Sequence, residues 1–192
     1  MRLLASILAA AAAVGFNVVA AQRLGQPGWE FLYAANLTLG ELWPIGDYGF
    51  GTRVAIPILG GTFEGPRMKG TVSNLGADWA VADSKGVLFA DARYNLRTDD
   101  GVDILIQLTG AGQPAGGFLV RSTYQTGHPD YEWLNYAITS GVLWLPGAVE
   151  SSKYTLIDVW QMTVPDKQNG VLFGDQRDSG ENLHDQSNHL EL

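Results

Sequence analysis

The chain has 192 residues, of which 46% are hydrophobic and 17% charged, a composition typical of one globular domain. Its formal net charge of −8 argues against nucleic acid as a partner and against docking on an anionic membrane surface, because both need clustered Lys and Arg. The sequence contains no cysteine, which excludes thiol catalysis and disulfide bonds. Its 24 glycines indicate many tight turns between short strands.

The N-terminus has the pattern of a secretory signal peptide. Arg2 precedes the apolar run 3–14, and small residues end at Ala21. This pattern predicts cleavage after Ala21, localisation outside the cell or in the secretory lumen, and no membrane contact after cleavage. An uncleaved signal anchor and a buried core helix are the alternative interpretations. Loss of residues 1–21 removes Arg2 and no acid, which changes the net charge from −8 to about −9.

A glycosylation motif follows in the first part of the mature chain. Asn36-Leu37-Thr38 matches the N-x-S/T acceptor pattern. In a chain that enters the secretory pathway, this motif predicts a glycan on Asn36. Sequons are short and often unused, so an unmodified Asn36 is the alternative.

The mature chain contains a series of alternating or short apolar segments, which predict strands. In chain order the expected strands are residues 29–39, 52–59, 69–74, 79–82, 87–97, 102–109, 118–125 and 154–164. Pro57 would confine the second strand to an edge or a bulge, and Gly60-Gly61 is interpreted as the turn that ends it. Asp100-Gly101 is a strong hairpin signal. Residues 131–145 fit either a short helix followed by a strand or two strands.

These elements predict an all-β, mostly antiparallel fold, a small closed or nearly closed β-barrel with a short helix or two. Closure is expected because it removes exposed strand edges. The expected organisation is a signal peptide at 1–21, a barrel domain at 22–164 and a polar, flexible tail at 165–192. The sequence leaves open whether the barrel forms a homo-oligomer.

The sequence lacks the motifs of several classes of enzyme and cofactor-binding protein. The sequence has no G-x-S-x-G elbow, no Walker loop, no dinucleotide-binding glycine motif and no H-E-x-x-H. Its three histidines are His128 in an expected turn and His184 and His189 in the tail. Because a catalytic transition-metal site usually needs several imidazoles on rigid elements, no metal and no cofactor are expected.

Polar side chains occur inside the expected strands with a period of two. Asp91, Arg93 and Asn95 share one face of their strand, and Arg121 and Thr123 share one face of another. If the apolar face packs outside, the charged face would point into a ligand-sized polar lumen. The alternatives are a solvent-exposed face and a structural ion-pair network.

Further candidates lie on other elements. Asp158 has apolar neighbours on both sides, so it is expected to pair with Arg93 or Arg121. Glu64, in the expected turn 61–66, could shuttle protons at a barrel mouth or simply face water. Aromatic residues that could wall a pocket are Trp79, Tyr124, Tyr131 and Trp133.

Five ordered motifs resemble those of domain-of-unknown-function family 3237 of bacteria and fungi. They are residues 60–67 (GGTFEGPR), 76–79 (GADW), 91–94 (DARY), 98–101 (TDDG) and 131–135 (YEWLN), and the resemblance spans roughly residues 29–162. It implies a compact β-barrel and says little about activity. The chain departs from the family's pattern where Asp103, Gln107 and Thr109 replace the usual Asn and Arg, which puts any site that uses those positions in doubt.

The signal peptide and polar tail are typical of fungal members. The chain also resembles, in size and export, fungal barrels of secondary metabolism that include cofactor-free hetero-Diels–Alder cyclases. That resemblance implies a cofactor-free cyclase, of hetero-Diels–Alder or dehydratase type, acting on a polyketide- or terpene-derived intermediate. The alternatives are a secreted barrel that binds a small molecule without catalysis, and a structural or interaction protein.

The cyclase hypothesis needs a shaped pocket, a proton donor and hydrogen bonds to a developing oxyanion. The ligand would be an apolar, oxygenated small molecule. The candidate catalytic residues are Glu64, Arg93, Arg121 and Tyr131, and the candidate ligand-binding residues are Trp79, Asp91, Thr123, Trp133, Asn135 and Asp158.

Overall fold

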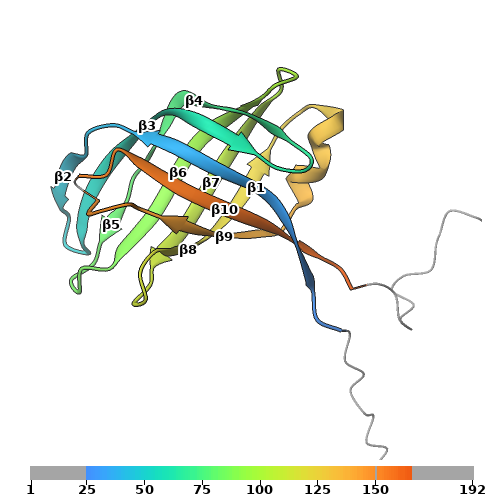
Figure 1. The fold of residues 1–192 in the computed structure, drawn as a ribbon. Coiled ribbons are helices and arrows are strands. Elements are labelled where there is room, and N and C mark those ends of the chain that lie inside the picture. Colours follow the sequence, from blue (N-terminus) through green and yellow to red (C-terminus); the bar gives the residue numbers. More distant parts are fainter. Residues whose placement is uncertain (1–24, 150, 166–192) are drawn as a thin grey trace, which may run out of the picture. The chain divides into compact units, whose positions relative to one another are not determined.

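The computed structural model describes residues 25–149 and 151–165. Within them, Pro27–Val164 form one compact unit, which is an antiparallel barrel (Figure 1). The expected signal peptide, nearly all of the expected tail, and His184 and His189 lie outside the described residues.

The described residues contain ten strands and one 3-10 helix, η1. In chain order these are β1 (Gly28–Leu39), β2 (Trp43–Asp47), β3 (Thr52–Glu64), β4 (Lys69–Asp78), β5 (Val81–Ala82), β6 (Leu88–Thr98), β7 (Asp103–Gly112), β8 (Phe118–Gln125), η1 (Pro129–Tyr136), β9 (Thr139–Trp144) and β10 (Tyr154–Thr163).

Eight of the strands close into a barrel. They follow the order β1-β10-β9-β8-β7-β6-β4-β3, and β3 pairs back onto β1 over Ala34–Leu39 and Ile58–Glu64. β2 pairs with the start of β3 on the same side of that strand as β1, and β5 bridges β3 and β6 at one end. The predicted all-β antiparallel barrel with a short helix is confirmed.

Side chains that alternate along the strands fill the barrel. The inward face of β6 carries Ala90, Ala92, Tyr94 and Leu96, and its outward face carries the polar residues between them. β7 contributes buried Ile104, Ile106 and Leu108 in the same way. An eight-stranded barrel has an interior just wide enough for such side chains, so the core lies inside the barrel.

The short helix η1 covers one end of the barrel. Its Leu134 is 0% exposed and belongs to the same core cluster. The guanidinium of Arg67 stacks over the Trp133 ring, 3.5 Å from its centroid. Of the two interpretations of residues 131–145, the helix followed by a strand is correct.

The predicted turn at Gly60-Gly61 is wrong, because both glycines lie inside the long strand β3. Gly61 has φ +141°, and a Cβ there would lie 2.1 Å from the carbonyl oxygen of Asn36 on β1. A glycine therefore marks the close approach of β3 to β1 that shuts the barrel. The true turn follows Glu64, at residues 65–68.

Two further boundaries differ from the expectation. Residues 75–77 were expected to separate two strands, but β4 runs through them with a register shift between Val72 and Gly76. β2 lies in the segment 40–51, which was expected to be a connection. Pro57 does sit at an irregularity, since the β3–β4 register shifts between Pro57 and Gly61. No helix in the described part of the chain is long and apolar enough to cross a membrane.

Candidate functional site

The predicted polar lumen is wrong. The alternation on β6 is as expected, but Asp91, Arg93 and Asn95 point outward and the apolar face of the strand points inward. Arg121 and Thr123 on β8 are likewise exposed. Burying several charges in so narrow a barrel would cost more than placing apolar side chains there, and this sets the orientation.

Four of the predicted residues nevertheless meet on the outer face of β6, β7 and β8. Asp91 and Arg93 form an ion pair at 3.0 Å, and Arg121 Nε donates to Thr109 Oγ1 at 3.0 Å. The register places Thr109 between Asp91 and Arg121, and Thr123 stands two residues along β8. Because these side chains are exposed, their ion pair adds little stability, and the cluster is a solvated surface.

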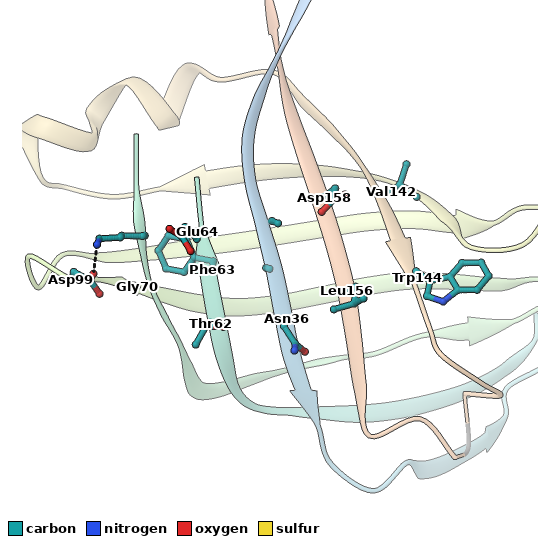
Figure 2. Close-up of a pocket in the computed structure, with 13 residues that line it drawn as sticks. Asn36, Thr62, Phe63, Glu64, Gly70, Asp99, Val142, Trp144, Leu156 and Asp158 are labelled. Atoms are coloured by element: carbon teal, nitrogen blue, oxygen red, sulfur yellow. Dashed lines mark ion pairs between the residues drawn. The ribbon is translucent and has the colours of Figure 1, made fainter. Parts of the chain in front are cut away.

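Glu64 and Asp158 lie in a second place, an open groove on the outside of the barrel (Figure 2). They flank Ala34, which pairs with Glu64 on one side and Asp158 on the other. The groove has a volume of about 780 Å³. Glu64 ends β3 rather than lying in a turn. Asp158 faces solvent, and the predicted pairing of Asp158 with Arg93 or Arg121 does not occur among the described residues.

The candidates on η1 serve the helix itself. Tyr131 Oη donates to the Asp100 carboxylate at 3.1 Å, and the Asn135 carboxamide bonds both the N–H and the carbonyl of Thr126. Hydrogen bonds from Thr98 and Tyr131 hold the pKa of the Asp100 carboxyl below its usual value. These contacts fix η1 on the barrel, and Trp133 stacks under Arg67 as described above.

At the opposite end, the barrel contains an acid that the sequence analysis did not select. Asp78 ends β4 and lines the lumen where β6 and β8 begin and β1 ends. Its carboxylate accepts the backbone N–H of Asp91 at 2.8 Å. Burial raises the pKa of Asp78 to about 6, and the negative charge of Asp91 adds to the rise, whereas that hydrogen bond and the charge of Arg53 lower it.

The lumen beside Asp78 is narrow and apolar. We call it the mouth cavity; its volume is about 40 Å³, above the roughly 10–15 Å³ that a cavity needs to hold one water molecule. Thr155 and Asp78 are the polar residues among those that line it. The lining is Leu37, Leu39, Ile56, Ile58, Asp78, Leu88, Ala90, Ala92, Tyr94, Leu108, Phe118, Leu143, Leu145, Thr155 and Ile157.

Exposed apolar residues stand at the same end. The β2–β3 hairpin pairs with β5, which pairs in turn with Leu88 of the cavity wall. Arg53 on this hairpin donates to the Trp79 carbonyl and lies 5.5 Å from the Tyr48 ring centroid. Contiguous exposed apolar side chains mark binding surfaces. The exposed apolar residues of the hairpin are Trp43, Ile45, Tyr48 and Phe50, and we call them the hairpin rim.

A cluster of phenols lies deeper in the barrel. The hydroxyls of Tyr33 and Tyr124 are 3.1 Å apart, and burial raises the pKa of both. Tyr94 lies close to this pair, and its ring lines the mouth cavity, but its buried hydroxyl makes no hydrogen bond of good geometry with any other described residue. Burial raises the pKa of Tyr94 as well, so all three phenols stay neutral at physiological pH.

One signal could have found Asp78. It stands in the motif Gly76-Ala77-Asp78-Trp79, where an acid is surrounded by small and apolar residues in a strand. In the part of the chain that the structure describes, no three His, Cys, Asp or Glu side chains are grouped to hold a metal ion.

Residues 27–162 match the protein family described as "Protein of unknown function (DUF3237)". The chain belongs to this family. Among curated proteins, a UPF0311 protein of Rhodopseudomonas palustris is 27% identical over 150 residues, 69% of this chain and 95% of its own. The hydroalkoxylation enzyme phnH of Penicillium herquei is 31% identical over 109 residues, 57% of this chain and 69% of its own.

Solved structures share the DUF3237 barrel. A β-barrel-like protein of Acinetobacter baumannii superposes with a TM-score of 0.65 at 30% identity, covering 73% of this chain and 100% of its own. An enzyme of Penicillium herquei superposes with a TM-score of 0.59 at 28% identity, covering 73% of this chain and 98% of its own.

Proposed function

We propose that this protein is a cofactor-independent cyclase that closes an oxygen-containing ring in an apolar, hydroxyl-bearing natural product. The observation that carries the proposal is the Asp78 carboxyl, which sits at the apolar mouth cavity with a pKa of about 6. A titratable group whose pKa is shifted by burial in a cleft is a candidate acid–base catalyst.

One relative supports this reaction class. The hydroalkoxylation enzyme phnH is named for the addition of a hydroxyl group across a carbon–carbon double bond, and such an addition within one molecule closes a ring. Every atom of the substrate is kept in the product, so neither an oxidant nor a reductant is needed. A polyketide- or terpene-derived intermediate of fungal secondary metabolism with a phenol and a conjugated double bond fits this chemistry.

Asp78 would transfer the proton. The ionised Asp78 carboxylate takes the proton of the substrate hydroxyl. At the same time the hydroxyl oxygen bonds to one carbon of the double bond. The carboxylic acid then returns the proton to the other carbon, so the enzyme ends as it began. General acid–base catalysis of this kind contributes about 10²–10⁴-fold in rate.

The arrangement around Asp78 would orient the substrate. The mouth cavity of about 40 Å³ admits the reacting end of a substrate rather than its whole body. The apolar body would rest on the hairpin rim, where Tyr48 and Phe50 are exposed. Arg53 stands close enough to lower the pKa of Asp78, so its charge would also stabilise an oxyanion that develops there.

Hetero-Diels–Alder and dehydratase reactions are the narrower alternatives within this class, and the product distinguishes them. A hydroalkoxylation product has the mass of its single substrate, a dehydratase product has lost one water, and a hetero-Diels–Alder product can join two substrates. A cycloaddition also moves no proton, so it would not need the Asp78 carboxyl.

The test uses ortho-hydroxychalcone, an apolar phenol whose hydroxyl adds to a conjugated double bond, alongside ortho-allyl phenols. The purified protein should accelerate ring closure over buffer and give one enantiomer in excess. The Asp78→Asn variant should retain the fold and lose this acceleration. A racemic product formed at the buffer rate with every compound of the panel would contradict the proposal.

A binding protein without catalysis is the second candidate, favoured by the apolar mouth and the hairpin rim. It predicts that the same compounds bind and leave unchanged. It also predicts that Asp78→Asn alters neither binding nor product. Equilibrium binding and turnover, measured on the same samples, therefore separate the two candidates.

A further inference from the structure

We propose that Asn36 carries an N-linked oligosaccharide whose first sugar lies in the outer groove, against Leu156 and Trp144. The proposal concerns the outside of the barrel and does not depend on the cyclase function. It requires entry into the secretory pathway, which the pattern of residues 1–21 predicts.

Asn36 and Thr38 face outward on the same side of β1, since Leu37 between them is buried and both are exposed. Asn36-Leu37-Thr38 is the one N-x-S/T motif in the sequence. Transfer of the sugar takes place on the unfolded chain as it enters the lumen, so a place within a strand does not prevent it. After folding, the outward direction of Asn36 leaves the attached sugar on the surface.

The register puts apolar side chains directly beside Asn36. Asn36 pairs with Leu156 on β10, and Leu156 pairs with Trp144 on β9. All three line the outer groove, and Figure 2 shows them on neighbouring strands. A sugar joined to Asn36 would therefore start at one wall of the groove and meet these two residues next.

These two side chains are large and poorly covered. Trp144 is 53% exposed and Leu156 is 42% exposed, although both belong to the rigid barrel wall. A pyranose ring presents C–H groups on one face, which pack on an indole ring and an aliphatic side chain. A groove of about 780 Å³ holds such a ring with room to spare. The glycan would remove an exposed apolar patch that otherwise invites association.

The covalent step uses a donor of known class. The Asn36 carboxamide nitrogen bonds to C1 of the first N-acetylglucosamine of a lipid-pyrophosphate-linked oligosaccharide. The bond between C1 and the pyrophosphate oxygen breaks, and the lipid pyrophosphate leaves with that electron pair. The nitrogen loses one proton, so charge and atoms balance.

The first experiment measures occupancy. The full chain is expressed in a yeast secretory host, and intact mass is recorded before and after peptide-N-glycosidase treatment. We expect an oligosaccharide on the wild type and on Thr38→Ser, which keeps the motif, and none on Thr38→Ala. A folded wild-type product that carries no sugar at Asn36, whether secreted or retained in the cell, would overturn the proposal.

The second experiment tests where the sugar lies. Thermal unfolding midpoints are compared for four forms. The wild type and Trp144→Ala are each measured in two states, one with the glycan trimmed to its first sugar and one made sugar-free by Asn36→Gln. The first sugar should raise the midpoint by a few degrees in the wild type and by much less in Trp144→Ala.

Leu119→Ala is the matched control, because Leu119 is an exposed apolar residue of the barrel wall that does not line the groove. The sugar should raise its midpoint as much as it raises that of the wild type. An equal gain in Trp144→Ala would show that the sugar does not lie on Trp144. A wild type that forms dimers through this face in its sugar-bearing form would also contradict a groove filled by the sugar.

Discussion

The Asp78 carboxylate accepts a hydrogen bond of 2.8 Å from the backbone N–H of Asp91, across the paired strands β4 and β6. This bond holds the carboxylate at the end of an apolar lumen. Burial outweighs the bond, so the pKa of Asp78 is raised to about 6. Asp91 was selected from the sequence as a candidate ligand-binding side chain. Here its backbone N–H holds the Asp78 carboxylate, and its own negative charge helps to raise the pKa of Asp78.

The first prediction concerns stability and pH. Because the folded-state pKa of Asp78 is raised from 3.8 to about 6, the folded state binds this proton more tightly than the unfolded state does. The free energy of unfolding should therefore fall as pH rises from about 4 to about 6 and level off above, by at most about 3 kcal/mol.

Asp78→Asn isolates this contribution, because the amide oxygen can still accept the Asp91 N–H but does not ionise. Denaturant unfolding of both proteins between pH 4 and 8 should show that the free energy of unfolding of the variant rises relative to that of the wild type as pH rises. A difference between them that does not change over this range would mean that the Asp78 carboxyl is not buried as described.

The second prediction concerns the buried phenols. Tyr94→Phe removes a buried hydroxyl that makes no hydrogen bond of good geometry within residues 25–149 and 151–165, so it should be neutral or raise the free energy of unfolding by up to about 1 kcal/mol. Tyr124→Phe deletes the partner of the Tyr33 hydroxyl and should lower the free energy of unfolding by about 1–2 kcal/mol. Urea denaturation measures both, and the reverse order would contradict this account of the core.

The third prediction concerns barrel closure. Gly61→Ala would put a Cβ into the backbone of Asn36 at a positive φ, and this should lower the free energy of unfolding by more than about 2 kcal/mol. Gly127→Ala is the control, because no atom of the described part of the chain lies within 4 Å of where a Gly127 Cβ would stand. Equal midpoints for the two variants would show that β3 and β1 do not approach closely at Gly61.

The fourth prediction concerns the hairpin rim. Phe50 is 85% exposed, and Phe50→Ser should raise KM for an apolar substrate several-fold with kcat nearly unchanged, because the rim binds the body of the substrate and not its reacting atoms. Tyr136 on η1 is 77% exposed at the other end of the barrel, so Tyr136→Ser should leave both constants as they are. Equal effects of the two variants on KM and kcat in steady-state kinetics would show that the hairpin rim does not bind the substrate.

The strands could be predicted where alternation was regular. The expected 118–125 coincides with β8, the expected 29–39 differs from β1 by one residue at its start, and the expected 87–97 is shifted by one residue from β6. Alternation failed where glycine serves a close contact instead of a turn, as Gly61 does against Asn36. It also failed for β2, whose Pro44 and Gly46 are typical of a connection.

The sequence pattern separates the two faces of each strand correctly, but the polar face was wrongly expected to point into the lumen. Period-two alternation separates Asp91 and Arg93 from Tyr94 and Leu96, yet it does not say which group enters the lumen. The volume of an eight-stranded barrel decides this in favour of the apolar group. The small and apolar neighbours of Asp78 indicate a buried acid, but its place at the lumen depends on where β4 meets the start of β6.

The most direct measurement is kcat/KM for ring closure by Asp78→Asn and by Glu64→Gln, with ortho-hydroxychalcone or the best compound of the panel. Asp78 lines the mouth cavity, whereas Glu64 lies outside the barrel. The Asp78 variant should lose about 10²–10⁴-fold, with wild-type activity falling as pH drops through about 6. Glu64→Gln and Arg93→Ala should stay within about 2-fold of the wild type, since their side chains face solvent. Full activity in Asp78→Asn, or its loss in Glu64→Gln, would contradict a catalytic site at the mouth cavity.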